Sequence, residues 1–88
     1  MKQIAQDVFK NSDTEILSAA IDSNGEAWCY TCPKSELMLL NSIWAIKKGV
    51  KRYWIGWGYD ATNWRESAID REVEWNPEHP GNKLVEQL

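Results

Sequence analysis

Residues 16–32 have the sequence ILSAAIDSNGEAWCYTC, in which two apolar runs flank the dipeptide Asn24-Gly25. Asn-Gly is the preferred centre of a two-residue hairpin turn, because both central positions need a positive φ angle. A turn of this kind places Ile21 opposite Trp28 and gathers the larger apolar side chains on one face of the ribbon. The sequence therefore predicts a β-hairpin over residues 15–32.

A helix is expected directly after this hairpin. Residues 33–48 carry apolar side chains at helical spacing, and the two lysines that end the segment suit the negative end of a helix dipole. The apolar side chains of the expected buried stripe are Leu39, Leu40, Ile43, Trp44 and Ile46. Gly49 is the expected residue just beyond the helix. The same spacing predicts a short amphipathic helix over residues 2–10.

Two further strands are expected nearer the C-terminus. Residues 50–59 alternate as a strand does, with Tyr53, Ile55, Trp57 and Tyr59 on the predicted core face and Arg52, Trp54, Gly56 and Gly58 on the other face. In residues 64–75 the apolar side chains alternate with Asp70, Glu72 and Glu74, so a strand is favoured there and a helix is the alternative.

The order of these elements is α-ββ-α-ββ. The simplest arrangement is an α+β fold in which residues 1–88 form a single domain. Its four-stranded, mainly antiparallel sheet would pack against the one long helix, because each element must bury its apolar face against another.

Composition is typical of a soluble globular protein, with 43% hydrophobic and 26% charged residues and a formal net charge of −3. The longest apolar stretch, residues 37–46, is interrupted by Asn41 and Ser42 and is far shorter than the roughly 20 residues of a membrane span. The N-terminus lacks the apolar region of a signal peptide. These features predict a cytoplasmic protein without a membrane partner, whose two cysteines are reduced thiols.

The segment Trp28-Cys29-Tyr30-Thr31-Cys32 contains the pattern W-C-x-x-C, which resembles the active site of thioredoxin-like oxidoreductases. The resemblance covers Trp28, Cys29 and Cys32, and it implies a thiol–disulfide oxidoreductase in which the first cysteine is a nucleophilic thiolate at a helix N-terminus. The proline that follows directly disfavours a helix start at the second cysteine. The hairpin also places the two thiols on opposite faces of one strand, too far apart for a disulfide. We therefore keep this enzyme as an alternative and expect two structural thiols.

No other catalytic constellation is visible in the sequence. The single histidine, His79, lies in a proline-rich turn, and one C-x-x-C pair with one histidine does not supply the four ligands of a structural zinc site. No metal and no other cofactor is expected.

Six tryptophans in 88 residues are difficult to bury together in so small a core, and binding surfaces are enriched in tryptophan, tyrosine and arginine. We therefore expect a non-enzymatic protein-binding module, such as an inhibitor, an adaptor or an antitoxin-like protein. The predicted binding residues are Arg52, Trp54, Gly56, Gly58, Asp70, Glu72 and Glu74. The acidic members favour a protein partner with a basic surface. An exposed aromatic strand at a sheet edge could equally mediate a homodimer.

Nucleic-acid binding is a further alternative. Lys47, Lys48, Lys51 and Arg52 place four basic residues within six positions, where they could contact phosphates. The neighbouring Trp54 could stack on a base. The negative net charge of the chain makes this alternative less favoured than protein binding.

Overall fold

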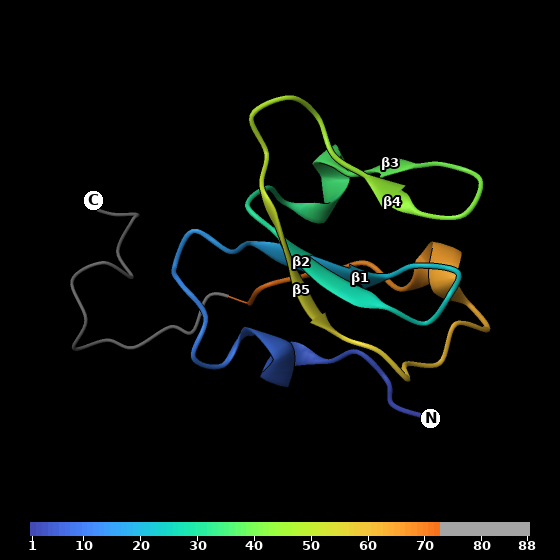
Figure 1. The fold of residues 1–88 in the computed structure, drawn as a ribbon. Coiled ribbons are helices and arrows are strands. Elements are labelled where there is room, and N and C mark those ends of the chain that lie inside the picture. The colour runs from blue at the N-terminus through green and yellow to red at the C-terminus, as the bar shows by residue number, and fades with distance from the viewer. Residues whose placement is uncertain (73–88) are drawn as a thin grey trace.

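The fold is built on one antiparallel sheet (Figure 1), in a computed structural model that describes residues 1–72. The sheet has the strand order β5-β2-β1-β6, with β5 (Arg52–Gly56), β2 (Ala27–Tyr30), β1 (Ser18–Ile21) and β6 (Ile69–Asp70). A separate two-stranded hairpin joins β3 (Met38–Leu39) to β4 (Trp44–Ala45). Three single 3-10 turns complete the described residues: η1 (Gln6–Phe9), η2 (Lys34–Glu36) and η3 (Trp64–Glu66).

The prediction of an α+β fold with one long helix is wrong. Residues 33–48 form η2 and the β3–β4 hairpin instead, and the expected helix over residues 2–10 is only the 3-10 turn η1. The four-stranded sheet is present, but the described part of the chain contains no α-helix that could pack against it. None of the helical segments found in residues 1–72 has the length and apolar character to cross a membrane.

The β3–β4 hairpin replaces the helix because contacts from distant residues stabilise it. The buried carboxylate of Asp22 accepts a hydrogen bond from the backbone N–H of Trp44, with an N···O distance of 2.8 Å. The N–H of Ser23 donates to the carbonyl of Ser42 at 3.1 Å. Helical periodicity within residues 33–48 carries no information about these partners, so tertiary contacts override the local pattern.

The β1–β2 hairpin lies where the sequence predicts it, but its register differs by one residue. Ile21 lies opposite Ala27, and Trp28 lies opposite Ala20. A shift of one residue changes every cross-strand pair, because successive side chains point to opposite faces. The predicted pairing of Ile21 with Trp28 is therefore wrong.

The cause of the shift is a three-residue turn. Gly25 has a φ of 86°, and it is the only residue of the turn with a positive φ. Its N–H donates to the carbonyl of Asp22 at 2.9 Å, while Oδ1 of Asn24 accepts a hydrogen bond from the N–H of Glu26 at 3.0 Å. A two-residue type I′ turn would need Asn24 at positive φ as well, whereas a three-residue loop needs only the glycine there.

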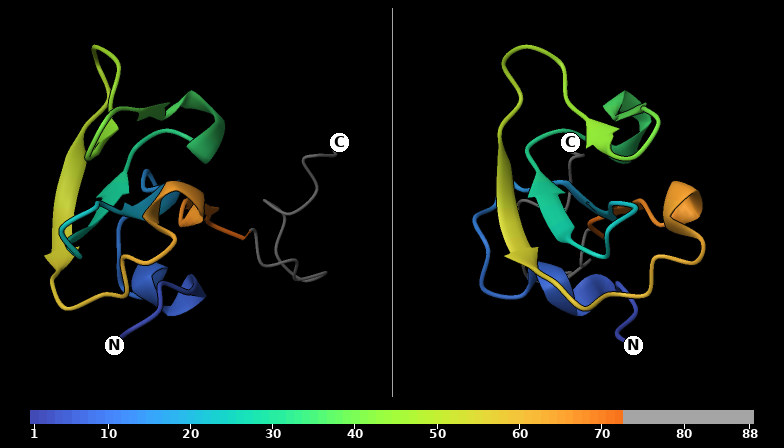
Figure 2. Two further views of the ribbon diagram at one scale, coloured as in Figure 1. Left: turned by 90° about the vertical axis from the view of Figure 1, so that its right-hand side faces the viewer. Right: turned by 45° about the vertical axis from the view of Figure 1, so that its right-hand side comes forward.

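Apolar side chains form one cluster on each face of the sheet. In Figure 2 the β3–β4 hairpin lies on one side of the sheet and η1 on the other. The first cluster comprises Ala20, Ile21, Ala27, Tyr30, Cys32, Trp44 and Trp64. The second comprises Phe9, Ile16, Ala19 and Cys29. The two cysteines thus belong to different clusters.

The segment predicted as a strand over residues 64–75 begins differently. Residues 64–66 form the 3-10 turn η3, and the strand β6 follows at Ile69–Asp70. Only this short part pairs with β1, where Ala19 lies opposite Ile69. The remainder of the predicted strand from residue 73 onward lies outside the described residues.

Candidate functional site

The strand β5 is an outer strand of the sheet (Figures 1 and 2) and pairs only with β2 within residues 1–72. The N–H of Thr31 donates to the carbonyl of Lys51 at 3.0 Å, so the backbone groups of Lys51 face β2. Backbone groups along an antiparallel strand face alternately toward one neighbour and the other. The N–H and C=O groups of Arg52 and Trp54 therefore face away from the sheet.

This free edge ends shortly after β5, because the N-terminal segment pairs with the following residues. The N–H of Lys2 donates to the carbonyl of Gly58 at 3.3 Å, and the N–H of Asp60 donates to the carbonyl of Lys2 at 2.7 Å. On the opposite side, the N–H of Tyr59 donates to the carbonyl of Gly25 at 3.1 Å. The unpaired stretch is therefore residues 52–57, which we call the open edge.

Large aromatic side chains are exposed along the open edge. The exposed fraction is 70% for Trp57, 53% for Trp54 and 44% for Tyr53. The guanidinium carbon of Arg52 lies 4.1 Å from the centroid of the Trp28 ring, within the range of a cation–π interaction. The open edge thus combines unpaired backbone groups with aromatic and cationic side chains.

The exposure of Trp54 agrees with its predicted place outside the core, whereas the core placement of Tyr53 and Trp57 is wrong. Trp28 lies opposite Trp54 but Ala27 lies opposite Gly56, so the register shifts at a bulge. An extra residue in one strand breaks the strict alternation of faces, so Trp57 no longer follows the pattern set by the residues before it. Tyr53, by contrast, borders an open pocket of about 290 Å³ on the face that carries the second core cluster.

Each of the two predicted glycines has one side chain of the protein at van der Waals distance. A Cβ atom at Gly56 would lie 3.9 Å from Cε1 of Tyr59, and one at Gly58 would lie 3.9 Å from Cε of Lys2. The Nζ atom of Lys2 lies 4.5 Å from the centroid of the Tyr59 ring. Side chains of the protein itself therefore lie beside both glycines.

The predicted acidic residues do not join this surface. Asp70 lies in β6, at the opposite end of the strand order from β5, and its Oδ1 accepts a hydrogen bond from the backbone N–H of Lys34 at 2.7 Å. The N–H of Glu72 donates to Oε1 of Gln6 at 3.0 Å. Glu74 lies outside the described residues. The predicted site residues within residues 1–72 thus do not form one continuous surface.

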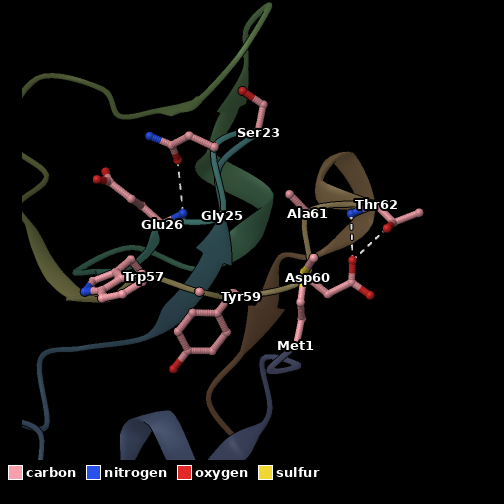
Figure 3. A pocket seen from close by; sticks show the side chains of 11 residues that line it. Met1, Ser23, Gly25, Glu26, Trp57, Tyr59, Asp60, Ala61 and Thr62 are labelled. Atoms are coloured by element: carbon pink, nitrogen blue, oxygen red, sulfur yellow. Dashed lines mark hydrogen bonds between the residues drawn. The ribbon is translucent and has the colours of Figure 1, made fainter.

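Two other carboxylates, which the sequence pattern did not single out, line a pocket that reaches the end of the open edge. Figure 3 shows Glu26 near Trp57 and the Asp60 side chain turned toward Thr62. Glu26 and Asp60 line a pocket of about 680 Å³ together with Trp57 (Figure 3). Asp60 accepts hydrogen bonds from the N–H and hydroxyl of Thr62, at 3.0 and 2.7 Å, and from Nε2 of Gln3 at 3.0 Å. These bonds lower the pKa of Asp60, so its negative charge persists under mildly acidic conditions. The position of Asp60 directly after the aromatic run was the one available signal.

The two cysteine thiols are free and buried. Burial raises the pKa of both Cys29 and Cys32, and Sγ of Cys29 donates a weak hydrogen bond to the carbonyl of Tyr53 at 3.5 Å. A reactive cysteine needs a lowered pKa and access to solvent. Cys29 lies within the strand β2 and not at a helix N-terminus, so the activation that the W-C-x-x-C resemblance implies has no structural basis in residues 1–72. In the same part of the chain, no group of three or more candidate ligands could hold a metal ion.

Asp22 is the most buried carboxylate described, with 3% exposure, and its hydrogen bond to Trp44 connects the β1–β2 turn to β4. Burial raises the pKa of Asp22 above its ordinary value of 3.8, although the hydrogen bond from Trp44 and the charge of Arg52 oppose the rise. Because the folded state holds this proton more tightly, the contribution of Asp22 to stability is complete below the ordinary pKa and is lost as the pH rises through the folded pKa.

We predict that Asp22→Asn removes the loss of stability that the wild type shows as the pH rises. The amide oxygen of asparagine can still accept the Trp44 hydrogen bond, and it carries no charge to desolvate. Urea unfolding between mildly acidic and neutral pH should show a difference in unfolding free energy, variant minus wild type, that increases with pH. Asp22→Ala is the matched control, because it leaves the Trp44 N–H unpaired and should cost about 1–3 kcal/mol. A pH-independent difference for Asp22→Asn would contradict the assignment.

Comparison with protein-family models, with curated proteins and with solved structures finds no match to this chain. The geometry of the described residues is therefore the basis for a functional proposal.

Proposed function

We propose that this chain is a small non-enzymatic protein-binding module, acting as an inhibitor or adaptor, and that it binds an extended segment of its partner along the open edge. The observation that carries the proposal is the combination of outward backbone groups at Arg52 and Trp54 with exposed aromatic rings on the same stretch. In strand addition of this kind, main-chain hydrogen bonds give affinity and alternate side chains give specificity.

The exposed side chains suit such an interface. Natural sheets protect outer strands with charges, prolines or coverage, because an unpaired edge readily pairs with another chain. The open edge is instead largely aromatic, and Trp54 and Trp57 belong to the residue type most often found at binding hot spots. Each indole can bring roughly 150–250 Å² of surface to an interface. We infer that these two rings contribute most of the binding free energy.

The charges around the open edge define the partner further. Glu26, near Trp57, favours a partner with basic groups at that end. Lys51 and Arg52 at the other end favour acidic groups. The two unpaired thiols, Cys29 and Cys32, support a reducing compartment, so the proposal keeps a cytoplasmic location.

The proposal is tested at Trp54. Trp54→Ala removes the ring but keeps the outward N–H, whereas Trp54→Pro also removes that N–H without breaking a bond between β5 and β2. Affinity capture from the source cell, followed by titration of the captured partner, should show about 30-fold weaker binding for Trp54→Ala, which corresponds to a hot spot of about 2 kcal/mol. Trp54→Pro should bind more weakly still, because strand addition needs the N–H.

Leu40→Ala serves as the control, because Leu40 is 52% exposed but lies between β3 and β4, away from the open edge. It should bind like the wild type. Circular dichroism must show that all three variants keep the β-sheet. A stoichiometric partner that binds both Trp54 variants as tightly as the wild type would refute binding at the open edge.

Nucleic-acid binding remains the second proposal. It is supported by the exposure of Lys47, Lys48 and Lys51, which lie between β4 and the open edge, next to Arg52. It would be favoured by a salt-sensitive mobility shift of a single-stranded oligonucleotide that is lost when Lys48 and Arg52 are both changed to Glu. The net charge of −3 makes it the weaker of the two proposals.

A further inference from the structure

The β3–β4 hairpin has an inner face and an outer face. Trp44 lies on the inner face, because it is buried and belongs to the first core cluster. Leu39 lies opposite Trp44 in the register, so its side chain is on the same face. Successive side chains of a strand alternate between the two faces. Met38 and Leu40, the neighbours of Leu39, are therefore on the outer face, away from the core cluster.

The outer face is apolar and exposed. The N–H of Leu40 donates to the carbonyl of Ile43 at 3.0 Å, so these two residues lie opposite each other and share this face. Leu40 is 52% exposed, and Met38 and Ile43 are exposed as well. The sequence pattern placed Leu40 and Ile43 in the buried stripe of a helix and so missed this surface. We call Met38, Leu40 and Ile43 the outer hairpin face. Neighbouring apolar side chains that stay exposed together indicate a contact surface.

The same part of the sequence is strongly basic. Residues 27–59 hold five basic side chains and one acidic side chain, Glu36, although the whole chain has a net charge of −3. Lys47 and Lys48 follow β4 directly in the loop that leads to β5, and both are exposed. Figures 1 and 2 show this loop beside the β3–β4 hairpin, on the side of the sheet away from η1. Positive charge therefore lies next to the outer hairpin face.

This combination of charge and apolar surface identifies the class of occupant. A second copy of the chain would bring its own lysines to the contact, and like charges would repel each other. A nucleic acid would attract the lysines, but Met38, Leu40 and Ile43 have no aromatic face on which a base could stack. An anionic lipid bilayer matches both features. Its headgroups attract lysines, and its boundary between headgroups and acyl chains accepts apolar side chains.

We propose that the outer hairpin face, together with Lys47 and Lys48, binds the surface of an anionic lipid bilayer. The expectation of a protein without a membrane partner rests on the lack of a spanning segment, which has no bearing on contact with a bilayer surface. The outer hairpin face shares no residue with the open edge. Membrane binding is therefore compatible with an adaptor that holds a protein partner along β5.

The test is cosedimentation with vesicles of equal parts phosphatidylserine and phosphatidylcholine, compared with vesicles of phosphatidylcholine alone. The wild type should bind the anionic vesicles, bind the neutral vesicles much more weakly, and dissociate as the salt concentration rises. Changing Lys47 and Lys48 together to Glu should weaken binding to anionic vesicles about 30-fold or more, because two attractive charges become repulsive. Changing Leu40 and Ile43 together to Ser should weaken it about tenfold or more, because the apolar contact is lost.

Lys10→Glu is the matched control for charge. Lys10 is exposed and directly follows η1, on the opposite side of the sheet, so the same charge change there should leave most of the binding intact. Circular dichroism must show that every variant keeps the β-sheet. The proposal is overturned if the wild type does not prefer anionic vesicles, if the serine variant binds them as tightly as the wild type, or if Lys10→Glu weakens binding as much as the double lysine variant. A chain that shifted an oligonucleotide but bound no vesicles would assign the lysines to nucleic acid and would also overturn it.

Discussion

Replacing Trp44 with alanine is expected to lower the free energy of unfolding by about 3–5 kcal/mol, the usual cost of deleting a buried tryptophan. The ring of Trp44 packs edge-on against Trp64, with ring centroids 6.5 Å apart and an interplanar angle of 86°. Its Nε1 also donates to the carbonyl of Trp64 at 3.1 Å. These contacts attach the β3–β4 hairpin to η3 and to the first core cluster, so their loss should detach that hairpin.

Trp44→Phe separates the contribution of aromatic packing from that of the indole hydrogen bond. Phenylalanine keeps much of the aromatic packing but cannot donate the indole hydrogen bond. The Trp64 carbonyl still accepts hydrogen bonds from the N–H and the hydroxyl of Ser67, at 3.1 and 2.7 Å, so the lost bond should cost only about 0.5–1.5 kcal/mol. Its effect should therefore be smaller than that of alanine. Urea unfolding, followed by circular dichroism so that loss of a fluorophore does not matter, gives both values. A cost below about 1 kcal/mol for Trp44→Ala would contradict a hairpin anchored by this residue.

The second large effect is expected at Gly25, where alanine should destabilise the protein by about 3 kcal/mol. With a φ of 86°, any residue other than glycine is strained, and a Cβ atom would lie 3.0 Å from the carbonyl oxygen of Tyr59. That oxygen belongs to the backbone, so it cannot move aside as the end of a side chain could.

Gly49 is a suitable control because it shares the conformation without the crowding. Its φ is 92°, and a Cβ atom there would meet nothing within 4 Å. Gly49→Ala should therefore cost only the strain of the left-handed conformation, about 1–2 kcal/mol. The difference between the two variants in thermal or urea unfolding measures the contact with Tyr59. Equal costs would show that the turn has room for a side chain and that its packing against Tyr59 is loose.

The positions of β1, β2 and β5 could be predicted from sequence, whereas the β3–β4 hairpin could not. Alternation and the Asn24-Gly25 signal indicate strands where β1, β2 and β5 occur. The apolar spacing in residues 33–48 fits a helix as well as it fits a hairpin. The polar pair Asn41 and Ser42, which lies at the tip of the hairpin, is the one local sign against a helix. What decides the outcome is the hydrogen bond from Trp44 to Asp22, a residue twenty-two positions away.

The candidate site likewise combines features that the sequence predicts with features that only the folded chain produces. The exposure of Trp54 follows from its place on the face with Arg52. The exposure of Trp57 does not, because it depends on a bulge that forms only when β5 pairs with β2. Glu26 and Asp60, which line one pocket with Trp57, also come from separate segments, so only the folded chain places them around the same pocket.

The β1–β2 turn has a consequence for protein engineering. The tip of a hairpin is ordinarily a good place to insert a tag or a new chain terminus, since it has few contacts. Here the turn is bonded on two sides: Ser23 to the β3–β4 hairpin and Gly25 to Tyr59. The loop around Gly49 has no such attachments at its glycine. A reporter, a split site or a permuted terminus should therefore be tolerated at Gly49 and should disrupt the fold at the Asn24-Gly25 turn.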